Sequence, residues 1–201
     1  MGFFETYIIG LGPALAYIAV FVTIFAESGL LIGFVLPGDS LLFPLGLLAS
    51  EGHFNLLFLC LITGIATIIG NQVGYAFGKK IGPALFNRKD SHFFNKEHLH
   101  KAHDFYEKNG AQTLVIARFV PFARTFAPIL AGISEMNYRT FMIYNVCGGI
   151  LWTSGVMILG FILGKAVPNI DNYILPITAL ILVVSILPSG IRALRNHKAK
   201  A

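Results

Sequence analysis

The sequence predicts an all-α integral membrane protein, built as an inverted repeat of two opposed re-entrant helical hairpins plus spanning helices. Hydrophobic residues make up 55% of the 201 residues and charged residues only 12%, and the mean hydropathy is +0.71. This composition is too apolar for a soluble domain of this length. Charge-free runs long enough to cross about 30 Å of hydrocarbon occur at 54–78, 140–164 and 172–191. Residues 1–201 are therefore expected to form a single transmembrane domain.

A first re-entrant hairpin is predicted over residues 14–50, directly after Pro13, which favours a helix start. This apolar run is interrupted at Gly29, Gly33 and the Pro37-Gly38 pair. Two half-length helices joined by a Gly/Pro turn are typical of a segment that enters and leaves on one side of the membrane. A full span at 6–26 followed by a shorter re-entrant loop fits the same pattern, and the sequence leaves both arrangements open.

A second re-entrant hairpin is predicted over residues 111–134. This stretch is apolar except for Arg118 and Arg124, and it is broken by Pro121 and Pro128, so it is too interrupted for a simple span. It follows a basic loop, and the long run after it must cross to the far side if the tail is to return through the last span. This parity requires the hairpin to enter and leave on the side of the basic loop.

The uneven placement of Lys and Arg sets the expected orientation. The first of them is Lys79, and seven lie within 79–108. Four more lie in the tail: Arg192, Arg195, Lys198 and Lys200. By the positive-inside rule, the loop 79–110 and the C-terminus are expected to be cytoplasmic. The net charge of +5 therefore needs no nucleic-acid partner to explain it.

Cysteine and histidine usage predicts neither a disulfide nor a metal centre. Cys60 and Cys147 lie within predicted spans, where two unpaired buried thiols are expected. Four histidines gather in the basic loop: His92, His98, His100 and His103. No cysteine joins them and nearby acids balance the lysines equally well, so no metal and no cofactor is expected.

An internal repeat supports two related halves. Residues 47–50 (LLAS), an aromatic residue and a Gly-rich span ending at 78–79 are echoed by residues 129–132 (ILAG), an aromatic residue and a span ending at 164–165. The offset is 82 to 86 residues. The first span is expected to run inward and the second outward, so the halves are inverted. Such halves place a binding site near the midplane, where the two broken segments meet.

Four charged residues within the hairpins are the candidate functional residues: Glu27, Asp39, Arg118 and Arg124. Ionisable side chains at membrane depth are costly and mark functional sites by default. The arginines present forked donors that match phosphate oxygens, so they are the candidate phosphate site. The carboxylates are candidate proton-coupling groups or counter-ions. Alternatively, the four charges form two buried ion pairs that lock the hairpins together, although stability alone is a poor reason to bury them.

The chain resembles the DedA family of membrane proteins, also called the VTT or SNARE-associated domain family, over nearly its whole length. The resemblance rests on F-A-E-S-G at 25–29, P-G-D at 37–39, G-N-x-x-G-Y-x-x-G-K at 70–79 and R-F-V-P-F-A-R-T-F-A-P-I-L-A-G at 118–132. The last motif is the most specific. The chain departs from the family at Asn71, where many members carry Asp.

The resemblance implies two opposed re-entrant hairpins, with the essential acidic pair at Glu27 and Asp39 and the essential arginine pair at Arg118 and Arg124. Other candidate supporting polar residues are Asn71 and Tyr75, both within the third motif. The resemblance also implies a multi-pass protein of the bacterial inner membrane that moves phospholipids or undecaprenyl phosphate, with a link to the proton motive force. Whether it works as a homodimer stays open.

The expected function is therefore a lipid-phosphate translocase rather than an enzyme, with a membrane lipid and protons as partners. A membrane-bound lipid phosphatase is one alternative. However, the Pro188-Ser189-Gly190 sequence is followed by Ile191 rather than by the histidine that acid phosphatases use. A proton-coupled transporter of another anionic solute is the second alternative. A passive ion channel is disfavoured, because charges of opposite sign would bind each other rather than line a selective pore.

Overall fold

The computed structural model describes residues 12–29, 38–86, 112–119 and 121–166, and every element in these ranges is helical. The elements in chain order are α2 (Pro13–Gly29), α3 (Gly38–Ser50), α4 (Leu56–Phe86), α6 (Gln112–Ile116), the 3-10 turn η2 (Ala117–Phe119), α7 (Pro121–Ile133) and α8 (Tyr138–Ala166). The predicted span 172–191, the four histidines and most of the predicted loop 79–110 lie outside the described residues.

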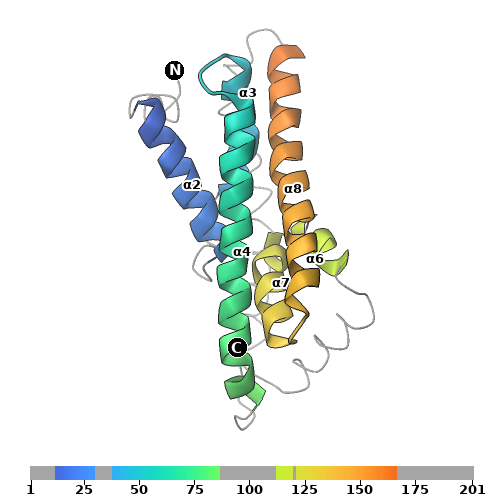
Figure 1. Cartoon of the computed structure of the whole chain (residues 1–201). Helices are drawn as coiled ribbons and strands as arrows, with labels where there is room; N and C mark the ends of the chain where they lie inside the picture. Colours follow the sequence, from blue (N-terminus) through green and yellow to red (C-terminus); the bar gives the residue numbers. More distant parts are fainter. Residues whose placement is uncertain (1–11, 30–37, 87–111, 120, 167–201) are drawn as a thin grey trace, which may run out of the picture.

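The two long helices α4 and α8 run antiparallel along the length of the molecule (Figure 1). Residues Leu56–Gly82 of α4 and the whole of α8 are long and apolar enough to cross a membrane. They include the predicted spans 54–78 and 140–164. Helix α4 continues as far as Phe86, into the region that the sequence predicts as a loop.

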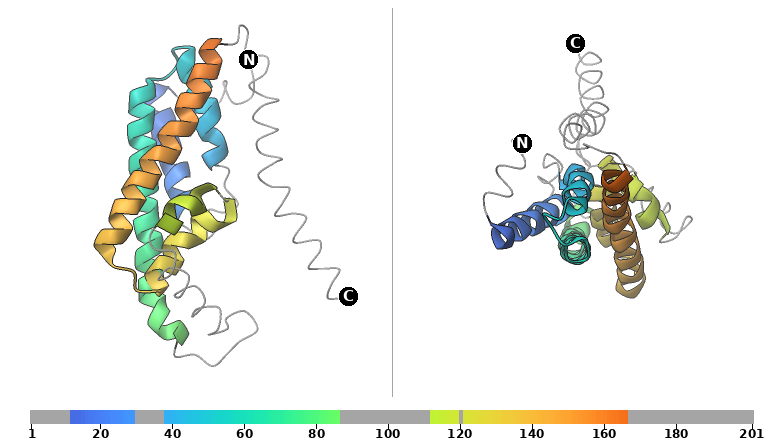
Figure 2. Two further views of the ribbon diagram at one scale, coloured as in Figure 1. Left: turned by 90° about the vertical axis from the view of Figure 1, so that its right-hand side faces the viewer. Right: turned by 90° about the horizontal axis from the view of Figure 1, so that it is seen from above.

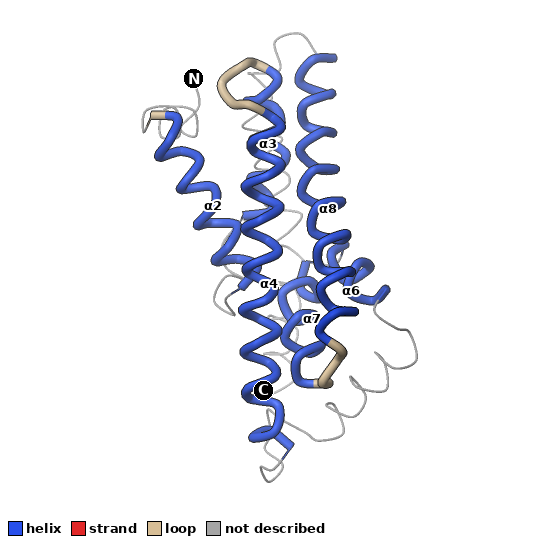
Figure 3. The backbone as a smooth tube through the Cα atoms, in the orientation of Figure 1, coloured by secondary structure: helices blue, strands red, loops and turns tan. Residues whose placement is uncertain are grey.

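The short helices pack against the long ones. Helix α3 packs mainly against α8, whereas α7 packs mainly against α4. Figures 1 and 2 show α3 beside one half of the molecule and α7 beside the other half. Helix α2 ends at Gly29 and α3 begins at Gly38, and both glycines belong to the predicted interruption. Two described turns, at 51–55 and 134–137, lie at opposite ends of the molecule (Figure 3).

The long helices are apolar on the outside and carry polar residues inside. Exposed apolar side chains follow the outer faces of both: Leu57, Phe58, Leu61, Ile65, Ile69, Val73 and Phe77 on α4, and Ile143, Ile150, Leu151, Ile158, Leu159 and Ile162 on α8. The inner face of α4 buries Thr63, Thr67 and Asn71, which are spaced four residues apart and therefore share one helix face. This distribution suits a helix that contacts lipid on one side and a polar site on the other.

Glycines allow the short helices to touch the long ones at backbone distance. A Cβ atom added at Gly78 of α4 would overlap the carbonyl oxygen of Ile129 on α7. A Cβ atom at Gly160 of α8 would likewise overlap the carbonyl oxygen of Phe43 on α3. Small residues at such crossings are typical of helix packing in membranes. Both cysteines are free thiols, as predicted, but neither is buried: Cys60 is partly exposed and Cys147 is exposed.

Candidate functional site

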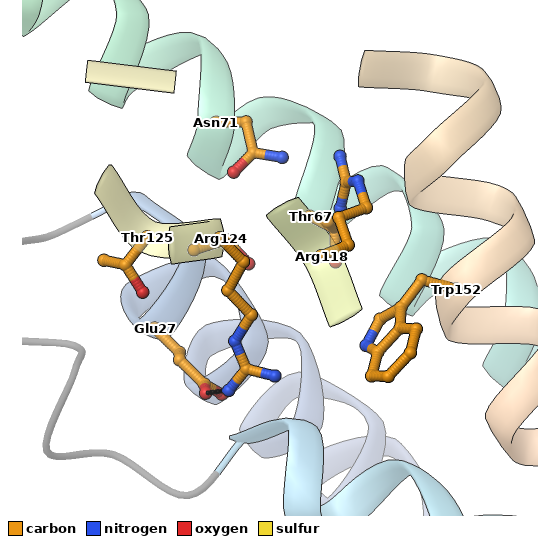
Figure 4. A pocket seen from close by; sticks show the side chains of 8 residues that line it. Glu27, Thr67, Asn71, Arg118, Arg124, Thr125 and Trp152 are labelled. Atoms are coloured by element: carbon orange, nitrogen blue, oxygen red, sulfur yellow. Dashed lines mark hydrogen bonds and ion pairs between the residues drawn. The ribbon is translucent and has the colours of Figure 1, made fainter. Parts of the chain in front are cut away.

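A pocket of charged and amide side chains lies where the inner ends of the short helices reach the two long helices (Figure 4). Its lining comes from α2, α4, η2, α7 and α8: Glu27, Ser28, Thr67, Asn71, Arg118, Arg124, Thr125 and Trp152. Three of the four charged candidates from the sequence therefore meet in one place. Residues almost one hundred positions apart in the chain form this site.

Glu27 and Arg124 form an ion pair across the pocket. The Arg124 Nη2 atom donates to Glu27 Oε1 at 2.6 Å. The Glu27 side chain is 6% exposed and the Arg124 side chain 22% exposed, so the carboxylate is the more deeply buried partner. Gly38, the first residue of α3, packs directly against this carboxylate, and a Cβ atom there would overlap it. The positive end of the α3 dipole therefore also favours the Glu27 charge.

Arg118 is held by an amide on the opposite helix. Its Nη2 atom donates to the side-chain Oδ1 of Asn145 at 3.0 Å and to the Asn145 backbone oxygen at 3.1 Å. Asn71 Nδ2 donates to the same Oδ1 atom at 2.8 Å, and Asn145 Nδ2 donates to the Ile68 carbonyl oxygen at 3.1 Å. Asn145 therefore links η2, α4 and α8. The amides fix where the guanidinium group lies.

The pocket is small in this structure. It leaves about 20 Å³ for the centre of a water-sized sphere, which is room for about one water molecule. The hydroxyl of Thr67 is buried and has no hydrogen-bond partner among the described residues. A buried hydroxyl without a partner is costly, so this group is available to water or to a ligand oxygen.

The other two predicted site residues are placed differently. Asp39 lies in the first turn of α3, and its side chain is outside what the structure describes. Tyr75 does not line the pocket. Its hydroxyl donates to the Met136 carbonyl oxygen at 2.5 Å, and its ring stacks on Phe141 at 4.4 Å. Tyr75 thus ties α4 to the turn between α7 and α8, which is a structural role.

Sequence reasoning missed Asn145, Thr67 and Trp152. Asn145 is the only amide in the charge-free run 140–164, and Trp152 is the only tryptophan of the chain. Each residue is therefore unusual in its sequence context and could have been singled out as a candidate, but the sequence does not indicate which way its side chain faces. Within the described ranges, no three His, Cys, Asp or Glu side chains form a group that could hold a metal ion. The side chains that the site presents are guanidinium, carboxylate, amide, hydroxyl and indole groups.

Two apolar helices long enough to cross a membrane, with buried charged side chains beside them, indicate a helical membrane protein. Comparison with known proteins agrees with this class. The chain is 42% identical over 183 residues to an uncharacterised membrane protein of Mycobacterium leprae (strain TN), covering 91% of this chain and 82% of that one. It is 41% identical over 187 residues to Protein DedA of Escherichia coli (strain K12), covering 92% and 85%.

A third relative is the inner membrane protein YqjA of Escherichia coli (strain K12), which is 34% identical over 149 residues, covering 74% of this chain and 68% of that one. The VTT domain model matches residues 36–162. No solved structure matches the chain. The chain therefore belongs to the DedA family of membrane proteins, which carries the VTT domain.

Proposed function

We propose that this protein moves a phosphorylated membrane lipid, undecaprenyl phosphate or a phospholipid, across the bacterial inner membrane. The observation that carries the proposal is the convergence of Arg118, Arg124 and Glu27 on one pocket between the membrane-length helices. Guanidinium groups bind phosphate oxygens through paired hydrogen bonds. A binding site for a lipid phosphate needs such cations at membrane depth, where they would otherwise be too costly to place.

The architecture that we propose for transport is an inverted repeat. The α2–α3 segment would be one re-entrant hairpin and the segment containing α6, η2 and α7 the other, with their inner ends at the pocket. The reciprocal packing of α3 on α8 and of α7 on α4 supports this arrangement. Inverted halves around a midplane site give a simple route to alternating access, because each half can open to one side of the membrane.

The ion pair suggests how protons could be linked to lipid movement. The Glu27 carboxylate is paired with the guanidinium group of Arg124 in this structure, so a phosphate must compete with the carboxylate for that cation. A proton that binds Glu27 from one side removes this competition and leaves Arg124 for the phosphate. Loss of the proton to the other side restores the pair and expels the phosphate. Asp39 is the second candidate for proton exchange.

We further propose that the protein acts as a transporter and not as an enzyme, and that its C-terminus is cytoplasmic. A homodimer is compatible with one site per chain.

The test of the proposed function is lipid exposure on the outer face of cells with and without the protein, measured for undecaprenyl phosphate and for phosphatidylethanolamine. The protein should change the exposure of one of them. Release of inorganic phosphate from the lipid, without a change in exposure, would indicate a phosphatase instead. Uptake of a soluble anion driven by a proton gradient, with lipid exposure unaltered, would indicate a solute transporter.

The arginine fork gives a sharper test of the site. Arg118→Lys and Arg124→Lys keep the positive charge but lose paired hydrogen bonding. Loss of one charged hydrogen bond, about 1.5–3 kcal/mol, predicts transport about 10- to 100-fold slower with normal protein accumulation. Arg139→Lys, an exposed arginine in the first turn of α8, is the matched control and should retain full transport. Full transport by both pocket variants would refute the fork.

A further inference from the structure

An apolar groove lies directly beside the charged pocket. It runs between the α6–η2 segment and α8, and on the same measure as the pocket it holds about 290 Å³. Arg118 and Trp152 line both spaces, so the groove and the pocket are neighbours that share two walls. Phe119 packs edge-on against Trp152 at 5.2 Å. The groove is therefore an apolar extension of a site whose other end is cationic.

The groove opens toward the outer surface of the helices. Phe119, Leu151 and Leu159 line it and are each 63% exposed. In a bilayer this surface meets lipid tails, so an apolar chain can enter the groove sideways without crossing water. A chain that follows the groove inward ends at Trp152 and Arg118.

Gly155, which has no side chain, leaves part of the groove open. A Cβ atom added at Gly155 on the groove wall would have no neighbour within 4 Å. Gly160, five residues further along the same helix, is packed so closely that a Cβ atom would overlap the backbone of α3. Gly155 therefore serves no close helix contact among the described residues, and the space beside it is open.

We propose that this groove binds one hydrocarbon chain of the phosphorylated lipid whose phosphate occupies the pocket. The inference rests on the proposed function and adds the binding mode of the substrate: the phosphate at Arg118 and Arg124, and a single chain between η2 and α8. The continuity of an apolar groove with a cationic pocket matches an amphiphile whose phosphate is attached directly to its chain. The groove selects for the chain, and the arginines select for the phosphate.

The protein supplies its own reporter for this proposal, because Trp152 is the only tryptophan. Bromine atoms on a hydrocarbon chain quench tryptophan fluorescence on contact. The probe is 3,4-dibromododecyl phosphate, whose bromine atoms lie near the phosphate and therefore near Trp152, which lines both the pocket and the groove; it is titrated into the purified full-length protein in detergent. Dibromododecanol, which has no phosphate, and inorganic phosphate, which has no chain, are the comparison ligands. The expected result is saturable quenching by the phosphate probe, competed by unbrominated dodecyl phosphate, and only unsaturable quenching by the alcohol.

The groove is tested by filling it. Gly155→Phe places a ring in open space and should raise the Kd of the probe at least about tenfold, the loss expected when about two methylene groups can no longer be buried. Ile158→Phe is the matched control, since Ile158 is exposed on the same helix and does not line the groove; its Kd should stay unchanged. Gly155→Leu is a smaller plug that keeps the test valid if the phenylalanine variant does not fold.

The outcomes separate the groove from the pocket. Saturable, phosphate-dependent quenching that both Gly155 variants leave unaltered would overturn the groove and keep the proposed phosphate site. Quenching that is the same for phosphate and alcohol, and that Arg118→Gln does not alter, would overturn both. If the predicted span 172–191 filled the groove instead, Gly155→Leu would lower the melting temperature well below that of Ile158→Phe, and the brominated chain would not quench. That result would also overturn the proposal.

Discussion

At the scale of single residues, the Glu27–Arg124 pair can be either a lock or a part of the transport cycle. Removing one partner of a fully buried pair leaves a stranded charge, at a cost of about 3–5 kcal/mol. The two partners differ here, because the Arg124 side chain is 22% exposed and that of Glu27 only 6%. A stranded Arg124 can be solvated more easily than a stranded Glu27 carboxylate, so the two single variants should differ in stability.

A double-mutant cycle tests this reading. Glu27→Gln should remain folded, Arg124→Gln should be the less stable of the two, and the double variant should be as inactive as either single variant. The measurements are thermal unfolding in detergent and lipid exposure in cells. If the pair is only a lock, both single variants unfold early and the double variant regains both stability and transport. That outcome would remove Arg124 from the phosphate site.

Gly38 offers a way to disturb the pair without changing any charge. Gly38→Ala introduces a Cβ atom where the Glu27 carboxylate now lies, so the carboxylate must move while α3 gains a better helix former. We expect slower transport, or transport with an altered pH dependence, at nearly unchanged thermal stability. Gly64→Ala on α4, where the added methyl group would make only ordinary contacts at 3.8 and 3.9 Å, is the control. Unaltered transport in Gly38→Ala would show that the carboxylate position is unimportant.

At the scale of the helices, glycines decide how closely the short and long elements approach. Gly78 meets Ile129 and Gly160 meets Phe43, and the two glycines are 82 positions apart in the sequence. The sequence repeat instead aligns Gly78 with Gly164. By packing, Gly78 of α4 therefore corresponds to Gly160 of α8, whereas by sequence it corresponds to Gly164. The two correspondences differ by four residues, which is about one helical turn.

Two glycines on α8 make a matched pair for stability. Gly160→Ala should lower the melting temperature clearly, since its Cβ atom overlaps backbone atoms that cannot move cheaply. Gly155→Ala should be neutral or stabilising, because alanine is favoured over glycine in a helix by about 1 kcal/mol and the site is open. Thermal unfolding in detergent measures both. Equal effects of the two substitutions would contradict the packing of α3 against α8.

These glycines also show what the sequence could and could not predict. The breaks at Gly29 and Gly38 were predictable, because helix breakers act locally. That Glu27, Arg118 and Arg124 lie together was also predictable, because a charged side chain in an apolar setting is costly unless it faces a partner or a polar cavity. In contrast, Gly155 and Gly160 look alike in the sequence, and only packing distinguishes an open groove from a close contact. The role of Asn145 was hidden for the same reason, since it depends on how α8 is rotated relative to α4.

At the scale of the whole molecule, the distribution of Lys and Arg predicts which end faces the cytoplasm. The turns at 51–55 and 134–137 lie at opposite ends, so they should face opposite sides. In a background without Cys60 and Cys147, His53→Cys should react with a membrane-impermeant thiol reagent in intact cells, and Arg139→Cys should react only in inverted vesicles. Both positions are exposed in the structure. The reverse labelling pattern would invert the proposed topology.

The small size of the charged pocket has a further consequence for the cell. A proton can leak through about 30 Å of hydrocarbon only along an unbroken file of water molecules or exchanging groups. The pocket has about 20 Å³ of space, enough for one water molecule, and its walls are joined by direct contacts between Arg124 and Glu27 and between Arg118 and Asn145. Among the described residues, the pocket itself has no room for a continuous file of water in this conformation, so we expect the protein at rest not to make an energised membrane leaky to protons.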